Sequence, residues 1–384
     1  MTATSSLRRL VPALCLGLLA VFTGAVAPAL AIETPAREAI LIDYDTGAVL
    51  MEKDADVSMP PASMSKIMTV FMVFEQLKEG RLQLDTKLPV SENAWRMGGS
   101  KMFVEVGSDI RVEDLLRGVV IQSGNDACVV LAEGLAGSEP AFAQAMSDRA
   151  KEIGLTNSHF ANATGWPDPG QRMTARDLAI LARRVIHDFP DYYHFFGETE
   201  FTWSDIRQGN RNPLLYKSIG ADGLKTGHTE EAGYGLVASA VQDGRRLILV
   251  VSGLDSVKAR AEESARLLTW GFRQFDNYEL AKAGETVETA EVWMGQSKTV
   301  PLVAAEDVVV TMQRASRKDM EVKVVYEGPL EAPIAAGSEI ARLTVSAPEM
   351  ESVSVPLQAG ADVPRLGPFG RIFANLKHMI FGTI

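Results

Sequence analysis

The pattern of hydrophobic and polar positions predicts strands at both ends of a domain and helices between them. Ala39–Tyr44 and Ala48–Met51 are short apolar runs around a turn, and Gly233–Val241 and Arg246–Gly253 repeat this arrangement, as β-hairpins do. Runs with helical spacing are found at Met64–Leu77, Val112–Leu135 (with a polar break), Pro140–Ile153, Thr174–His187 and Lys258–Phe275. We therefore expect an α+β domain over residues 32–276, a sheet covered by helices.

The pattern changes after about Asn277. Short runs that alternate apolar and polar residues are separated by Gly-Pro and Ala-Pro. Alternation with a period of two is typical of half-buried strands, as at Val322 and Val324, Leu343 and Val345, and Val353 and Val355. Residues 277–363 are therefore predicted to form a small β-sandwich domain.

The last segment, residues 364–384, has an apolar stripe at helical spacing. Polar residues fall mostly off this stripe, and Gly367, Pro368 and Gly370 weaken its helical start. Such a segment suits an amphipathic helix that lies in a membrane interface, although a helix packed on its own domain would show the same pattern. The stripe consists of Leu366, Phe369, Ile372, Phe373, Leu376, Met379 and Ile380.

The first 31 residues have the features of a secretory signal peptide. Arg8 and Arg9 precede an apolar run from Leu10 to Val26, and Ala29-Leu30-Ala31 offers a small-x-small cleavage site. An uncleaved membrane anchor is the alternative, but the apolar run is short and interrupted. We expect an exported, periplasmic protein whose mature chain begins near Ile32.

Composition narrows the class of protein. The 384 residues suffice for two domains, and the formal net charge is -11. An acidic chain of this kind argues against a nucleic-acid partner, because phosphate recognition needs a basic surface. Cys15 would leave with the signal peptide, so Cys128 would have no intrachain partner and the exported domains would be held together by their cores.

Three short elements carry candidate chemistry, in the order Ser63-Met64-Ser65-Lys66, Ser123-Gly124-Asn125 and Lys225-Thr226-Gly227. Each is weak alone, and Ser91-Glu92-Asn93 is a second match to the middle one. Ser63 follows a Pro-Pro pair at the start of an apolar helix, with Lys66 on the same helical face. A buried lysine with a lowered pKa can remove the proton of a serine hydroxyl. The alternative is a helix-capping serine beside an exposed lysine.

The other two elements also have a purely structural interpretation. Ser123-Gly124-Asn125 interrupts two apolar helical pieces, so it could relay a proton or simply form a turn. Lys225-Thr226-Gly227 precedes the second hairpin, where Gly227 would let a substrate approach an edge strand and the other two would hold a carboxylate. A solvated strand end is the alternative.

Together the three elements resemble the signature set of penicillin-binding proteins and serine β-lactamases. The longer runs Gln122–Cys128 and Asp222–Thr229 are similar to those of low-molecular-mass D-alanyl-D-alanine carboxypeptidases. The resemblance covers nearly all of the chain after the signal peptide. It implies a penicilloyl-serine transferase (β-lactamase-like) domain, a β-rich C-terminal domain and a terminal membrane-binding helix.

The resemblance also implies a role for each residue in hydrolysing the terminal D-alanine from peptidoglycan stem peptides. Ser63 would be the nucleophile and Lys66 its base, and Asn125 would orient Lys66 and the substrate. Ser123 would protonate the leaving amine, with electrostatic support from Lys225. The oxyanion would bind to backbone N–H groups of Ser63 and His228, and the substrate carboxylate to Thr226 beside Gly227, to Arg211 and to Arg260. No metal or cofactor is implied.

Rival functions use the same site. A β-lactamase must deacylate quickly, which in one class relies on a glutamate, whereas residues 162–171 contain Asp168 and no glutamate. Inhibition by β-lactams is therefore expected. An endopeptidase or transpeptidase, or a non-catalytic cell-wall scaffold, remains open. Because Cys128 is close to Asn125 in sequence, thiol reagents are also expected to slow the enzyme.

Overall fold

The computed structural model describes residues 32–348 and 350–381 of the chain. The chain divides into two compact units, Met1–Ile32 and Glu33–Ile384, and the helices and strands of the described residues all belong to the second. The predicted signal peptide lies outside the described residues.

A five-stranded antiparallel sheet is the centre of the N-terminal domain, in the order β2-β1-β9-β8-β7. The predicted hairpins are confirmed as β1–β2 and β8–β9. The edge strand β7 carries Lys225-Thr226-Gly227, and within the described part of the chain it pairs only with β8. The strands are β1 (Glu38–Asp43), β2 (Val49–Lys53), β7 (Ala221–Thr229), β8 (Gly233–Gln242) and β9 (Arg245–Leu254).

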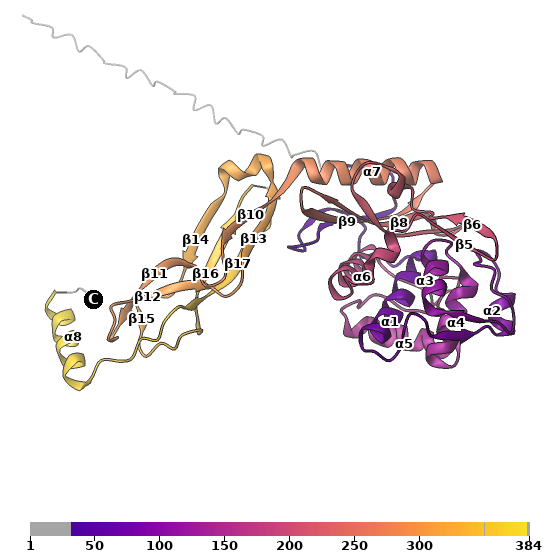
Figure 1. Ribbon diagram of the computed structural model, residues 1–384. Coiled ribbons are helices and arrows are strands. Elements are labelled where there is room, and N and C mark those ends of the chain that lie inside the picture. The colour runs from indigo at the N-terminus through magenta and orange to yellow at the C-terminus, as the bar shows by residue number, and fades with distance from the viewer. Residues whose placement is uncertain (1–31, 349, 382–384) are drawn as a thin grey trace, which may run out of the picture. The chain divides into compact units, whose positions relative to one another are not determined.

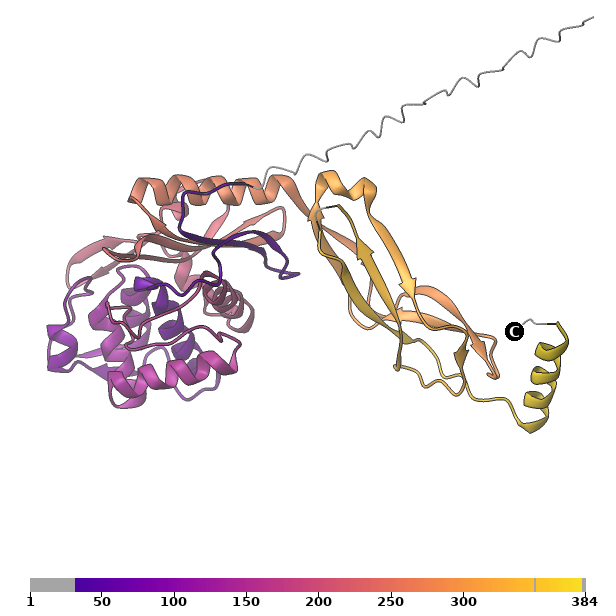
Figure 2. The same ribbon diagram turned by 180° about the vertical axis from the view of Figure 1, so that it is seen from behind.

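Helices cover both faces of this sheet (Figure 1). A helical cluster lies on one face and α7 (Val257–Gln274) runs along the other, as the reverse view also shows (Figure 2). The cluster comprises α1 (Lys66–Lys78), α2 (Glu92–Arg96), α3 (Val112–Val120), α4 (Asn125–Ala136), α5 (Glu139–Glu152) and α6 (Ala175–Asp188). Two further pairs of short strands lie outside the main sheet. They are β3 (Lys87–Pro89) with β4 (Asp109–Arg111), and β5 (Glu200–Trp203) with β6 (Ile206–Gly209).

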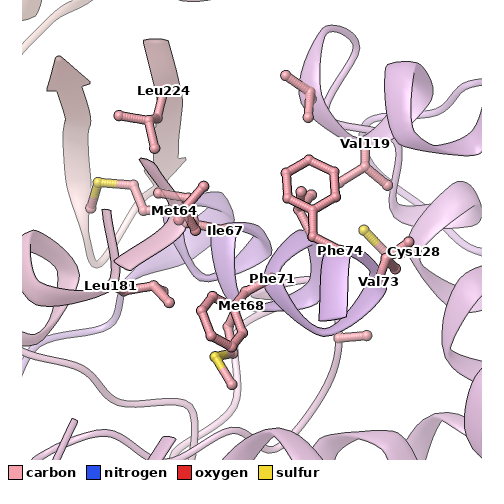
Figure 3. Close-up of a cluster of buried hydrophobic side chains, with 14 of the residues drawn as sticks. Met64, Ile67, Met68, Phe71, Val73, Phe74, Val119, Cys128, Leu181 and Leu224 are labelled. Atoms are coloured by element: carbon pink, nitrogen blue, oxygen red, sulfur yellow. The ribbon is translucent and has the colours of Figure 1, made fainter. Parts of the chain in front are cut away.

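Helix α1 lies inside this cluster and is apolar on nearly all sides. Ile67, Met68, Phe71 and Phe74 are fully buried and contact side chains from several other elements, as Figure 3 shows. A helix that is hydrophobic all round is a buried helix. The polar group at its first residue, Lys66, is therefore held in a dry environment.

The C-terminal domain is built mainly of strands, as predicted, with a 3₁₀ helix at Arg314–Asp319. A six-stranded sheet has the order β14-β16-β17-β12-β11-β15, and β10 pairs with β13. The alternating pattern correctly located these strands. It correctly predicted that Leu343 and Val345 are buried, but Val322 and Val353, which it also predicted to be buried, are exposed. The strands are β10 (Phe275–Ala281), β11 (Thr286–Trp293), β12 (Thr299–Ala304), β13 (Val308–Gln313), β14 (Glu321–Val325), β15 (Leu330–Glu331), β16 (Glu339–Ser346) and β17 (Val353–Ala359).

The terminal helix α8 spans Pro368–Phe381. Proline is well suited to the first turn of a helix, where its missing N–H costs no hydrogen bond. Phe369 is 88% exposed and Phe373 71% exposed, and the other apolar side chains of the predicted stripe that the structure describes are also exposed, apart from Leu366. Within residues 32–348 and 350–381, no helix has both the length and the hydropathy that a membrane span requires.

Candidate active site

Ser63 and Lys66 lie side by side at the start of α1. Ser63 belongs to a 3₁₀ turn, Ala62–Ser65, that leads directly into the helix. The Lys66 Nζ atom is 2.9 Å from Ser63 Oγ, and the lysine has no exposed surface. The alternative of an exposed lysine beside a capping serine is therefore wrong, because no side-chain cap forms here and Lys66 is buried.

Two fixed acceptors determine how the Lys66 amine is oriented. Its Nζ donates to Asn125 Oδ1 at 2.7 Å and to the carbonyl of Thr164 at 2.5 Å. Asn125 is itself held by donation from Nδ2 to the carbonyl of Gly98 at 2.9 Å. A neutral amine has two N–H groups and one lone pair. With both N–H groups engaged, the lone pair is left for the Ser63 hydroxyl.

Burial makes the neutral form of Lys66 accessible. The pKa of Lys66 is lowered to about 8, mainly by desolvation and also by the positive charge of Arg211, whereas Cys128 and Asp126 oppose the shift. Charged groups are disfavoured in an apolar environment, so an amine there releases its proton at a lower pH. A pKa close to neutral suits a residue that accepts and returns a proton.

A second serine–lysine pair faces the first. Lys225 Nζ donates to Ser123 Oγ at 3.0 Å and to the carbonyl of Thr226 at 3.2 Å. Burial lowers the pKa of Lys225 well below its ordinary value, and the nearby Lys66 adds to the effect. Ser123 has a φ of 59°, an uncommon conformation for a non-glycine residue, in the link between α3 and α4. The three sequence elements thus meet at one place.

One cavity of about 440 Å³ opens above these pairs. Lys66, Asn125 and Lys225 lie behind it, where they bond to its serines or to each other. Every other residue predicted for the site lines the cavity directly: Ser63, Ser123, Arg211, Thr226, Gly227, His228 and Arg260. At Gly227 a Cβ atom would lie 2.9 Å from the carbonyl oxygen of Pro61, so only glycine lets β7 approach the serine turn this closely.

Two guanidinium groups share this cavity. Arg211 donates to Ser100 Oγ at 2.6 Å. Arg260 is 94% buried, and among the described residues its Nε has no hydrogen-bond partner and no carboxylate forms an ion pair with it. Burial lowers the pKa of Arg260 to about 10. A buried cation without a counter-charge is costly, so this wall of the cavity favours an anionic ligand.

Several groups of the site were not predicted from the sequence. Ser100 and Tyr234 line the cavity, and the Thr164 carbonyl binds Lys66. The loop with Thr164 is held by Asn162, whose Oδ1 accepts from the backbone N–H groups of Thr164, Gly165 and Trp166. Asparagine side chains commonly accept hydrogen bonds from the backbone a few residues further along, so Asn162-Ala163-Thr164-Gly165 could have been identified as a turn. No residue type, however, indicates that the backbone carbonyl of Thr164 would bind Lys66.

Two other sequence hypotheses also bear on the site. Asp168 is exposed, accepts from the backbone N–H of Gly170 at 2.7 Å and does not line the catalytic cavity. Cys128 is fully buried, and desolvation raises its pKa to about 12. A buried neutral thiol is unreactive, so the burial argues against the hypothesis that thiol reagents slow the enzyme.

Taken together, the geometry assigns the protein to the serine enzymes that form an acyl intermediate with lysine, rather than histidine, beside the nucleophile. Comparison with known proteins gives the particular family. Residues 24–256 match the Peptidase S11 model of D-alanyl-D-alanine carboxypeptidases, and residues 275–365 match the C-terminal domain of penicillin-binding protein 5. The chain belongs to the Peptidase S11 family and is an enzyme of the D-alanyl-D-alanine carboxypeptidase class.

Individual relatives agree in sequence and in fold. The D-alanyl-D-alanine carboxypeptidase DacC of Escherichia coli is 41% identical over 366 residues, which cover 92% of each chain. Penicillin-binding protein 5 of Haemophilus influenzae is similar with a TM-score of 0.81 at 36% identity, over 87% of this chain and 99% of that one. Penicillin-binding protein D2 of Listeria monocytogenes, solved in an ampicillin-bound form, has a TM-score of 0.58 at 30% identity, over 63% of this chain and 98% of that one.

Proposed function

We propose that this enzyme removes the terminal D-alanine of peptidoglycan stem peptides through an acyl-enzyme on Ser63. The observation that carries the proposal is the 2.9 Å contact between Lys66 Nζ and Ser63 Oγ in a fully buried setting. Neutral Lys66 takes the hydroxyl proton as Ser63 Oγ attacks the carbonyl of the penultimate D-alanine. The backbone N–H groups of Ser63 and His228 stabilise the resulting oxyanion.

Collapse of this intermediate breaks the peptide bond and releases the terminal D-alanine. Its amine leaves with a proton delivered through Ser123, whose hydroxyl is bonded to Lys225. The acyl group stays on Ser63 until water attacks it, and Lys66 accepts the proton of that water. Hydrolysis restores the free serine and yields the shortened peptide.

The substrate carboxylate is recognised by other groups that line the same cavity as Ser63. Arg260, Arg211 and the hydroxyl of Thr226 supply two cations and one donor there. Donors with full positive charge form the stronger hydrogen bonds to a carboxylate. This arrangement supports cleavage next to a free chain end.

A β-lactam presents a strained amide and a carboxylate to the same groups, so it is expected to acylate Ser63. No carboxylate side chain lines the catalytic cavity among the described residues, and Asp168 lies outside it. In one class of β-lactamases a glutamate activates the water that rapidly hydrolyses the penicilloyl group, and without such a carboxylate we expect this hydrolysis to be slow. This supports inhibition by β-lactams over β-lactamase activity.

The direct test uses a pentapeptide ending in D-Ala-D-Ala. The protein should release one equivalent of D-alanine per peptide, and prior treatment with penicillin should abolish the release. A Ser63→Ala variant serves as the matched control and should be inactive. Release that persists in this variant, or that resists penicillin at full labelling, would refute the proposal.

We further propose that the enzyme is exported and works on the periplasmic face of the cytoplasmic membrane, held there by α8. The predicted signal peptide supports export. The exposed apolar side chains of α8, with Arg371 on the same helix, support a helix that lies in the membrane interface. Such a helix binds without crossing the bilayer.

A further inference from the structure

We infer that Tyr234 is a positioning residue that makes this enzyme select peptides ending in a free carboxylate, and so favours carboxypeptidase over endopeptidase action. The inference rests on the proposed function. Tyr234 lines the catalytic cavity but belongs to none of the three sequence elements. It lies near the start of β8, directly across from His228 on β7.

The tyrosine ring contacts two groups of the site at once. Its ring stacks on that of His228, with centroids 3.9 Å apart and planes 28° from parallel. The Arg260 guanidinium carbon lies 5.7 Å from the same centroid, within the range of a cation–π interaction. One side chain on β8 therefore connects a residue of the edge strand with a residue of α7.

The two arginines of the cavity are held in different ways. Arg211 is oriented by a hydrogen bond to Ser100 Oγ. Arg260 has an unpaired Nε and no carboxylate bound to it among the described residues, so the face of Tyr234 is the contact that fixes its guanidinium plane. Bidentate binding of a carboxylate depends on that plane.

Removing the ring would leave the Arg260 charge in place but free its orientation. A peptide with a free carboxylate would then lose its oriented partner, whereas a peptide with a neutral terminal amide or a further residue would lose little. The cost falls on binding, because the carboxylate is recognised in both the ground state and the transition state. Tyr234 thus affects selectivity rather than the acylation chemistry.

The experiment compares acyl-D-Ala-D-Ala with its C-terminal amide in the full enzyme. Tyr234→Leu should raise KM for the acid at least tenfold, change kcat less than threefold and lower the acid-to-amide ratio of kcat/KM about tenfold. Tyr234→Phe keeps the ring and should stay within twofold of the wild type. In an Arg260→Ala background, Tyr234→Leu should have no further effect on the ratio, since the coupled partner is gone.

An unchanged ratio in Tyr234→Leu would overturn the inference, as would equal losses for both substrates in a variant with an unaltered melting temperature. A Phe variant that behaves like the Leu variant would also contradict it, because the hydroxyl and not the ring would then matter. A wild-type enzyme that releases no D-alanine from the acid would instead refute the proposed function. The two failures are therefore distinguishable.

Discussion

The burial of Lys66 lowers the pKa of its amine, which determines whether it can accept the Ser63 proton. A lysine with an ordinary pKa of 10.5 is almost entirely protonated at pH 7, whereas a pKa of about 8 leaves roughly a tenth of it neutral. Only the neutral amine can accept the Ser63 proton, so the active fraction increases as pH rises through 8. Acylation should therefore become faster with pH across this range.

The position of Lys66, and much of the site, could be predicted from the sequence. The apolar run of α1 predicts a central helix, so a lysine at its first turn is expected to be buried. The resemblance to the signature set of penicillin-binding proteins implies that three elements far apart in the chain form one site, and the structure brings Ser63, Ser123 and Lys225 together around one cavity.

Other parts of the site could not be predicted, for physical reasons. The Thr164 carbonyl is a backbone group, and its identity as a Lys66 acceptor depends on loop geometry that residue types do not encode. Tyr234 meets Arg260 through the packing of α7 against β8, and it meets His228 through the pairing of β7 with β8. Contacts between distant elements of this kind leave no local pattern in the chain.

At the level of elements, Gly118 of α3 packs closely against the side chain of Met102. A Cβ atom on Gly118 of α3 would lie 2.4 Å from Met102 Sδ and 2.9 Å from Met102 Cγ. The backbone N–H groups of the next two residues, Phe103 and Val104, donate to the carboxylate of Asp126 on α4. Met102 also lies two residues beyond Ser100, which lines the cavity. A displaced Met102 would therefore move a lining segment of the site.

Gly118→Ala should lower kcat/KM for D-alanine release about three- to tenfold and lower the melting temperature by a few degrees, because overpacking forces neighbouring groups to shift. Gly367→Ala is the matched control, since a Cβ there meets nothing within 4 Å. Kinetics and thermal unfolding of both variants provide the measurement. Wild-type values for Gly118→Ala would show that the segment accommodates the methyl group without cost.

For the molecule as a whole, α8 should determine where the enzyme works but not how it works. A chain truncated after Pro364 should lose binding to anionic lipid vesicles in a sedimentation assay and keep full D-alanine release. Ile372→Ser combined with Phe373→Ser should weaken binding at least tenfold, because apolar area buried in the interface is lost. Asn375→Ser is the control and should bind like the wild type. Undiminished vesicle binding by the truncated chain would contradict membrane attachment through α8.

The pH dependence of Ser63 acylation tests the central claim most directly. The rate of labelling by a fluorescent penicillin, with the adduct located by mass spectrometry, should increase about tenfold between pH 7 and pH 9, with a midpoint near 8. Lys66→Arg, which stays protonated throughout, should be at least a hundredfold slower and show no such rise. A flat profile in the wild type, or an adduct on a residue other than Ser63, would contradict the account.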